Sequence, residues 1–181
     1  MKKFFFLLST IYYLLSTSSP AYAASEFTTS FNSLYTIESS GETNVTHTIT
    51  IKNNLAHIYA TNYSIATSGD QLNNIQTRDE FGSIANTTTT QNRVTTIHLS
   101  IDRPAISKDQ QKTLTLSYQT TDVVESIGDT LTLNIPRLSR ANEAGEYTRV
   151  VKIEGIQDRH QFIYPPQSKT EPDGDFTTYT F

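Results

Sequence analysis

The histidines are the residues of this sequence best suited to bind a metal or move a proton at neutral pH. There are four of them, His47, His57, His98 and His160, and no two lie two or four residues apart, the spacings that place two ligands on one face of a strand or helix. A zinc or iron site would have to be assembled from distant residues, and we predict none. His47 alternates with apolar residues and is expected to be a partly buried core residue, whereas His98 is expected to be exposed.

Carboxylates gather near the end of the chain, where Glu171 precedes Asp173-Gly174-Asp175. Calcium prefers oxygen ligands of this kind, which makes Asp173 and Asp175 weak metal candidates. The segment lacks the alternating ligand series of an EF-hand, so a solvated linker is the favoured interpretation.

No recognisable catalytic motif occurs in the sequence. The chain has no cysteine, which excludes a thiol nucleophile, a disulfide framework and a cysteine zinc site. It also lacks a Gly-x-Ser-x-Gly elbow, a His-Glu-x-x-His helix, a phosphate-binding loop and a dinucleotide fingerprint. We therefore predict a chain that is not an enzyme and needs no cofactor, with a triad of distant Ser, His and Asp residues left open.

Two lysines, Lys52 and Lys112, are candidates for an intramolecular isopeptide bond of the kind found in Gram-positive pilin modules. Such a bond needs an apolar site that holds a lysine, an Asn or Asp, and a carboxylate that carries a proton. Alternation turns Lys52 away from the apolar face of Ile51, whereas Lys112 shares a face with Leu114. The favoured interpretation of both is a solvated lysine at a strand edge.

The first 23 residues have the layout of a secretory signal peptide. Lys2 and Lys3 precede a helical apolar stretch that ends by Leu15, and Ala21-Tyr22-Ala23 is a small-x-small cleavage site. Cleavage is expected after Ala23 or Ala24, although retention as an anchor stays open. The apolar stretch falls short of the roughly 20 residues of a membrane-spanning helix. We expect a secreted or cell-envelope protein, typical of bacteria, without a stable membrane span after cleavage.

Composition and charge limit the class of the remaining chain. The sequence contains 29 threonines and 18 serines, and threonine favours strands. Removing two of the 14 basic residues with the signal segment leaves 12 against 18 acidic residues, a net charge of −6 with neutral histidines. This acidic balance argues against a nucleic-acid partner.

Alternation of apolar and polar residues recurs along the chain with turn signals between the runs, which predicts half-buried strands. Clear runs cover 27–37, 45–51, 59–65, 95–101, 112–120, 131–135 and 147–153, with a short strand at 75–78 and an edge strand or loop at 87–90. The segment 123–127 is compatible with a strand or one helical turn. We predict an all-β, immunoglobulin-like sandwich of two antiparallel sheets with about eight or nine strands over residues 24–164.

The last part of the chain changes in character. Tyr164-Pro165-Pro166 is expected to be extended, and 167–175 is polar with Pro172 and Gly174. Alternation resumes over 176–181. We interpret residues 165–181 as a linker followed by the start of a further strand or of a truncated next domain.

A set of turn and core residues resembles a known module. It comprises Tyr35, Gly41, Val45, His47, Ile49, Ile51, Asn53, Tyr59 and Tyr63, followed by Asp79-Glu80-Phe81-Gly82, Ile97, Leu99, Leu116-Ser117-Tyr118, Asn134-Ile135-Pro136-Arg137 and Tyr164-Pro165-Pro166. This pattern resembles the N-terminal β-sandwich module of exported bacterial transglutaminase-like proteins, and its layout is distantly similar to the luminal β-domains of ribophorin I.

The resemblance implies a non-catalytic lead module that precedes a papain-like Cys-His-Asp domain, which this cysteine-free chain cannot itself contain. We therefore expect a structural or interaction module whose partner is a neighbouring domain or an envelope protein. The alternatives are an adhesin or pilin-like surface domain that binds through sheet edges or loops, and a small hydrolase with a nonlocal site.

Overall fold

A computed structural model describes residues 25–127, 130–136, 144–155 and 164–181. The predicted signal segment, with Ala23 and Ala24, and His160 lie outside the described residues. Within the described residues the chain has thirteen strands and no helix. In that part of the chain no helix is therefore long and apolar enough to cross a membrane.

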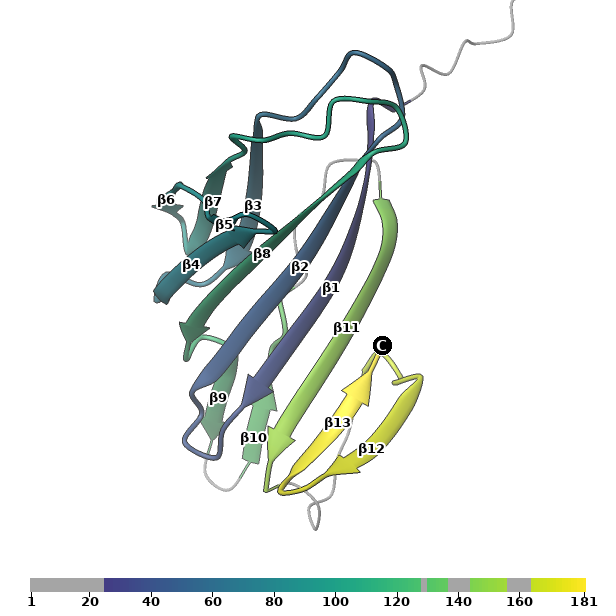
Figure 1. Ribbon diagram of the computed structural model, residues 1–181. Helices are drawn as coiled ribbons and strands as arrows, with labels where there is room; N and C mark the ends of the chain where they lie inside the picture. Colours follow the sequence, from purple (N-terminus) through teal and green to yellow (C-terminus); the bar gives the residue numbers. More distant parts are fainter. Residues whose placement is uncertain (1–24, 128–129, 137–143, 156–163) are drawn as a thin grey trace, which may run out of the picture.

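Figure 1 shows how the strands are arranged. In chain order they are β1 (Phe27–Ile37), β2 (Thr43–Asn53), β3 (Asn62–Ser68), β4 (Asn73–Asp79), β5 (Gly82–Ser83), β6 (Asn86–Gln91), β7 (Val94–Ser100), β8 (Gln111–Thr120), β9 (Val124–Ile127), β10 (Thr130–Leu133), β11 (Ala144–Glu154), β12 (Lys169–Asp173) and β13 (Phe176–Thr180).

These strands form one large sheet and two small ones. The large sheet has the order β12-β13-β11-β1-β2-β8-β4-β5, and the small sheets are β3-β7-β6 and β10-β9. One hydrophobic core joins the layers, since Ile49 of β2 and Leu116 of β8 cluster with Ile65 of β3 and Ile97 of β7. The predicted all-β sandwich is confirmed.

The predicted strands at 27–37, 45–51 and 112–120 are the centre of the large sheet. In β1, β2 and β8 buried and less buried residues alternate, as expected for strands with one face on the core. The segment 123–127, left open by its sequence, contributes strand β9, and 87–90 belongs to β6 at the edge of its sheet. Within residues 24–164 the structure describes eleven strands, β1 to β11, which exceeds the predicted eight or nine because short pieces such as β5 carry little hydrophobic pattern.

One pairing differs from the predicted antiparallel arrangement. β1 and β11 run parallel, with Leu34 opposite Val150 and Ile37 opposite Ile153. β11 follows β10, which belongs to a small sheet, so the chain reaches the edge of β1 by a crossover and not by a hairpin. A crossover permits parallel pairing, and the large sheet is therefore mixed.

The end of the chain belongs to the large sheet, in contrast to the predicted linker. Residues 169–173 form β12, which pairs with β13, and β13 pairs with β11 from Val150 to Glu154. Tyr179 and Thr177 of β13 are buried. The strand predicted at 176–181 is confirmed, whereas the linker interpretation of 167–175 is wrong for β12, because Pro172 and Gly174 fit an outer strand and its turn.

Candidate functional site

Three ionisable side chains of the described residues meet where β4 and β8 pair. Lys112 of β8 is opposite Ile51 of β2, and Asp79 of β4 is opposite Leu114 of β8. Partners across a ladder project to the same face, so Lys112 and Asp79 both project to the core face, beside each other. Their side chains are only 4% and 5% exposed. We call Asp79, Glu80, Phe81 and Lys112 the Lys112 cluster.

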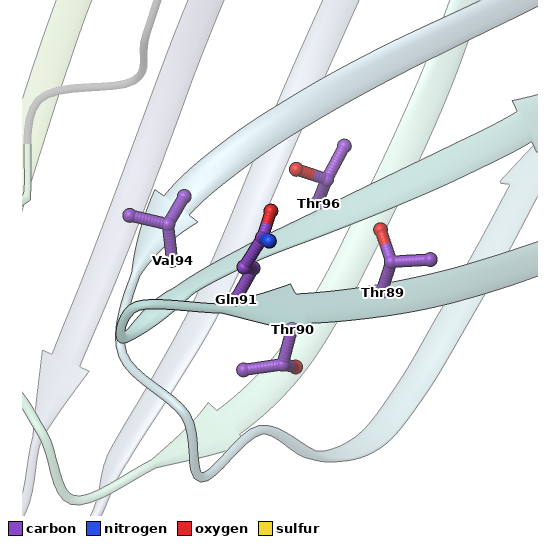
Figure 2. Close-up of a pocket in the computed structure, with 5 residues that line it drawn as sticks. All are labelled: Thr89, Thr90, Gln91, Val94 and Thr96. Atoms are coloured by element: carbon purple, nitrogen blue, oxygen red, sulfur yellow. The ribbon is translucent and has the colours of Figure 1, made fainter.

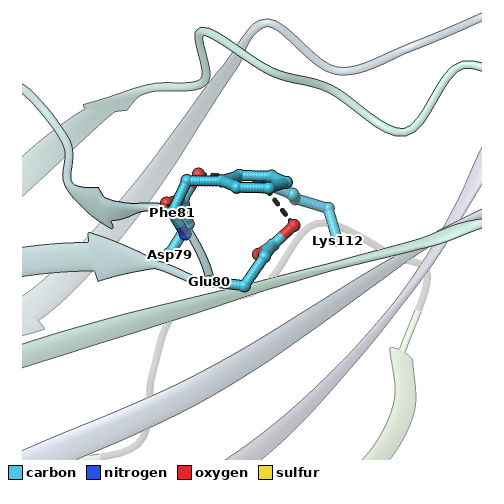
Figure 3. Close-up of polar contacts among 4 residues, drawn as sticks. All are labelled: Asp79, Glu80, Phe81 and Lys112. Atoms are coloured by element: carbon cyan, nitrogen blue, oxygen red, sulfur yellow. Dashed lines mark hydrogen bonds and ion pairs between the residues drawn. The ribbon is translucent and has the colours of Figure 1, made fainter.

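The Lys112 cluster is joined by short polar contacts, shown in Figure 3. Lys112 Nζ donates to Asp79 Oδ2 at 2.6 Å and to Glu80 Oε1 at 2.9 Å. The other carboxylate oxygen, Asp79 Oδ1, accepts the backbone N–H of Phe81 at 2.8 Å. The ring of Phe81 covers the ammonium group, with Nζ 4.7 Å from the ring centroid. One lysine therefore binds two carboxylates beneath an aromatic cover.

The opposite charges of Lys112 and Asp79 stabilise each other. The hydrogen bond from Lys112 holds the pKa of Asp79 below its usual range. Burial alone would lower the pKa of Lys112, but the hydrogen bonds to Asp79 and Glu80 outweigh burial and raise the pKa. Both groups are therefore charged at neutral pH.

Lys112 corrects the prediction of a solvated lysine, because its ammonium group is buried in this ion pair. Lys52 does lie on the other face, where it pairs with Asp109 at 2.8 Å and stays 39% exposed. No local pattern marks Asp79 and Glu80 as partners of Lys112, since they lie 33 and 32 residues away from it in the chain. Only the pairing of β4 with β8 brings them together.

A second polar group lies inside the core. His47 Nδ1 is hydrogen-bonded to Ser33 Oγ at 2.8 Å and Nε2 to the Tyr118 hydroxyl at 3.2 Å, while that hydroxyl lies 3.5 Å from Thr67 Oγ1. The ring of Tyr35 packs edge-on against the imidazole. His47 is fully buried, which confirms its predicted place in the core.

Burial sets the chemistry of this group. It lowers the pKa of His47 to about 4 and raises the pKa of Tyr118 to about 12, so both are neutral at physiological pH. Ser33 and His47 have the contact of a nucleophile and a base, but neither side chain is exposed to solvent. A substrate has no access to them, and we interpret the pair as a structural element of the core.

A second Ser-His contact lies on the surface. His98 of β7 is exposed, as predicted, and its Nδ1 is hydrogen-bonded to Ser64 Oγ of β3 at 2.8 Å.

On β6 and β7, a hollow of about 370 Å³ is lined by Thr89, Thr90, Gln91, Val94 and Thr96 (Figure 2). This lining offers hydroxyl, amide and methyl groups but no ionisable side chain.

The acidic residues predicted as weak metal candidates lie on the C-terminal hairpin. Asp173 ends β12, and its Oδ2 accepts a hydrogen bond from Lys152 Nζ of β11 at 2.6 Å. Asp175 follows in the turn before β13. Among the residues that the structure describes, no three His, Asp or Glu side chains are grouped so that they could hold a metal ion.

Comparisons of sequence find no relative. No family model matches the chain, and no curated protein matches its sequence.

Comparison of structure finds zinc metallopeptidases of the M1 type. A mutant of the M1 zinc metallopeptidase from Deinococcus radiodurans superposes with a TM-score of 0.55 at 11% identity over 90% of this chain and 40% of that chain. The unmutated enzyme gives 0.54 at 11% identity over 86% of this chain and 38% of that chain. A two-domain M1 zinc metallopeptidase mutant bound to L-tryptophan gives 0.53 at 10% identity over 86% and 39%. The chain thus shares a fold with these proteins and spans about two fifths of their length.

Proposed function

We propose that this chain is a non-catalytic β-sandwich module of an exported protein and that it works beside a separate catalytic domain. The observation that carries the proposal is the extent of the structural match. Nine tenths of this chain corresponds to two fifths of a metallopeptidase chain, so most of that enzyme lies outside the matched fold. A sandwich of this type therefore occurs as one part of a larger hydrolase.

The polar residues of the chain support the same role. His47 is buried in the core and is hydrogen-bonded there to Ser33 and Tyr118. In the Lys112 cluster, the ammonium group of Lys112 and the carboxylate of Asp79 are buried against each other, which keeps both groups away from a substrate. These groups stabilise a scaffold.

The class of the catalytic partner is the finer part of the proposal. The fold likeness favours a zinc metallopeptidase domain. The resemblance in turn and core residues favours a transglutaminase-like domain with a cysteine nucleophile. The export part of the proposal is supported by Lys2, Lys3 and the apolar stretch that follows them.

The test separates the module from its partner. Antibodies raised against the purified chain are used to isolate native material from the source cells, and peptidase and acyl-transfer activities are measured on both preparations. We expect activity in the native material and none in the purified chain. The proposal would be contradicted if the purified chain turned over a substrate and the His98→Ala variant did not.

Two inhibitors then distinguish the partner classes. A metal chelator stops a zinc metallopeptidase, whereas a thiol-alkylating reagent stops a cysteine enzyme. Because this chain contains no cysteine, alkylation acts only on the partner.

A second candidate function, a surface binding domain, is favoured by the edge strand β6. Its residues Thr87 to Gln91 are all exposed, and the strand carries neither a charge nor a proline, the usual protections of a free edge. Such an edge is able to accept an extended segment from another protein. This role would be favoured if the chain bound a ligand and Thr88→Pro abolished the binding without changing the folding of the chain.

A further inference from the structure

We propose that Lys112 and Asp79 condense to an intramolecular isopeptide bond that covalently joins β8 to β4. This inference is independent of the role proposed above, since it concerns only the chain's own strands. It rests on the placement of Lys112 and Asp79 on the core face at the end of the large sheet, with the partly exposed carboxylate of Glu80 within hydrogen-bond distance of the lysine.

The reacting groups are already in contact. Lys112 Nζ lies 2.6 Å from Asp79 Oδ2, and both side chains are at most 5% exposed. Groups held in this way react as if at very high concentration, because the entropy of bringing them together has been lost on folding. Burial also keeps water away from the carbonyl carbon, so the reverse hydrolysis is disfavoured.

The neighbours of the pair supply the other parts of an acyl transfer. Glu80 Oε1 lies 2.9 Å from Nζ, within reach of the proton that the amine must lose. The backbone N–H of Phe81 donates to Asp79 Oδ1 at 2.8 Å and stabilises the negative charge that develops on this oxygen during attack. The Phe81 ring excludes water from the side of Nζ.

The reaction balances without an oxidant or a co-reactant. A proton moves from the ammonium group to Oδ2 along their hydrogen bond, which gives a neutral amine and a neutral carboxyl group. The Nζ lone pair attacks Cγ of Asp79, and a bond between nitrogen and carbon forms. Glu80 takes a proton from Nζ and passes it to the departing oxygen, the bond between Cγ and Oδ2 breaks, and one molecule of water leaves.

The resting ion pair sets the speed of this step. Because Asp79 and Lys112 stabilise each other's charges, the neutral pair is a minor form, and condensation is expected to be slow relative to folding. Among the described residues, two other Lys-Asp pairs differ from the pair of Lys112 in their exposure to solvent. The pairs Lys52 with Asp109 and Lys152 with Asp173 are equally short, at 2.8 Å and 2.6 Å, but their side chains are 33–63% exposed.

The experiment is the intact mass of the folded full chain, measured after purification and again after prolonged incubation. We expect the wild type to be lighter than its sequence by one water molecule, and Lys112→Arg and Asp79→Ala to have their full mass. Lys52→Arg is the matched control and should still lose water. A wild type that keeps its full mass after incubation would overturn the proposal.

Tryptic peptides place the bond without any variant, in case Lys112→Arg or Asp79→Ala fails to fold. An amidated Lys112 is not cleaved, so residues 79–93 should appear as a branched species joined to residues 109–137. Ring closure of Asp79 on its own backbone also loses water, but it gives a linear peptide and persists in Lys112→Arg. That result would contradict the isopeptide bond.

Discussion

His47 and Ser33 lie directly opposite each other on β2 and β1, with Nδ1 2.8 Å from Oγ and neither residue exposed to solvent. The other imidazole nitrogen contacts the hydroxyl of Tyr118. A neutral ring satisfies both contacts, whereas a protonated ring would place an uncompensated charge in the core. The pair therefore links folding stability to pH.

Acid is expected to destabilise the protein through His47. Its pKa is about 4 in the folded state and about 6.5 when unfolded, so the unfolded state binds a proton first as pH falls. The stabilisation is complete above pH 6.5 and is lost progressively down to about pH 4, for a total of roughly 3 kcal/mol. Urea denaturation at a series of pH values measures this loss.

His47→Gln is the control for the pH effect, since glutamine is neutral and can still form hydrogen bonds. The difference in free energy of unfolding between wild type and variant should shrink as pH falls from about 6.5 to about 4. A difference that stays constant over this range would show that His47 is not the group responsible.

Compared with wild-type chain that has not yet lost water, Lys112→Met is expected to lower the free energy of unfolding by about 3 kcal/mol, because it leaves the carboxylate of Asp79 buried without its cation. Lys52→Met is the matched substitution on the same kind of pair in an exposed position, where solvent screens the charges, and it should cost much less. Chemical denaturation of both variants gives the comparison. Equal losses would refute the distinction between the two pairs.

Removal of residues 168–181 tests whether the C-terminal hairpin belongs to the sandwich. The deletion removes the buried Tyr179 and exposes the edge of β11, including Val151. Loss of the tyrosine alone should cost about 2 kcal/mol or more. Thermal unfolding measures the effect, with Lys169→Ala, an exposed position on β12, as the control. An unchanged Tm after deletion would restore the linker interpretation.

A metal chelator and a thiol reductant are both expected to leave the Tm unchanged. The chain has no cysteine, and Asp173, the nearest approach to a metal ligand on the hairpin, is paired with Lys152. Differential scanning calorimetry with and without each reagent checks this. A lower Tm in the chelator, reversed by added calcium, would point to a site at Asp173 and Asp175.

The strands that carry the core could be predicted from the sequence. Alternation located β1, β2 and β8, and the same parity placed His47 inside and His98 outside. Period two works here because one face of each strand packs on the core while the other meets water.

The candidate site could not be predicted, because it depends on which strands pair. Alternation places Lys112 on the face of Leu114, yet its burial depends on Asp79, a residue of another strand that meets β8 only in the folded sheet. The parallel pairing of β1 with β11 could not be predicted for the same reason, since the hydrophobic pattern contains no information on strand order. β12 could not be predicted because all five of its residues are exposed, so apolar and polar residues do not alternate along it.

Turnover of peptide and acyl substrates by the purified chain, with zinc supplied and an active metallopeptidase as positive control, addresses the proposed module directly. We predict no turnover above that of buffer, and activity only in native material that contains the catalytic partner. Turnover by the chain alone, lost in Ser64→Ala or His98→Ala while folding is retained, would contradict a non-catalytic role.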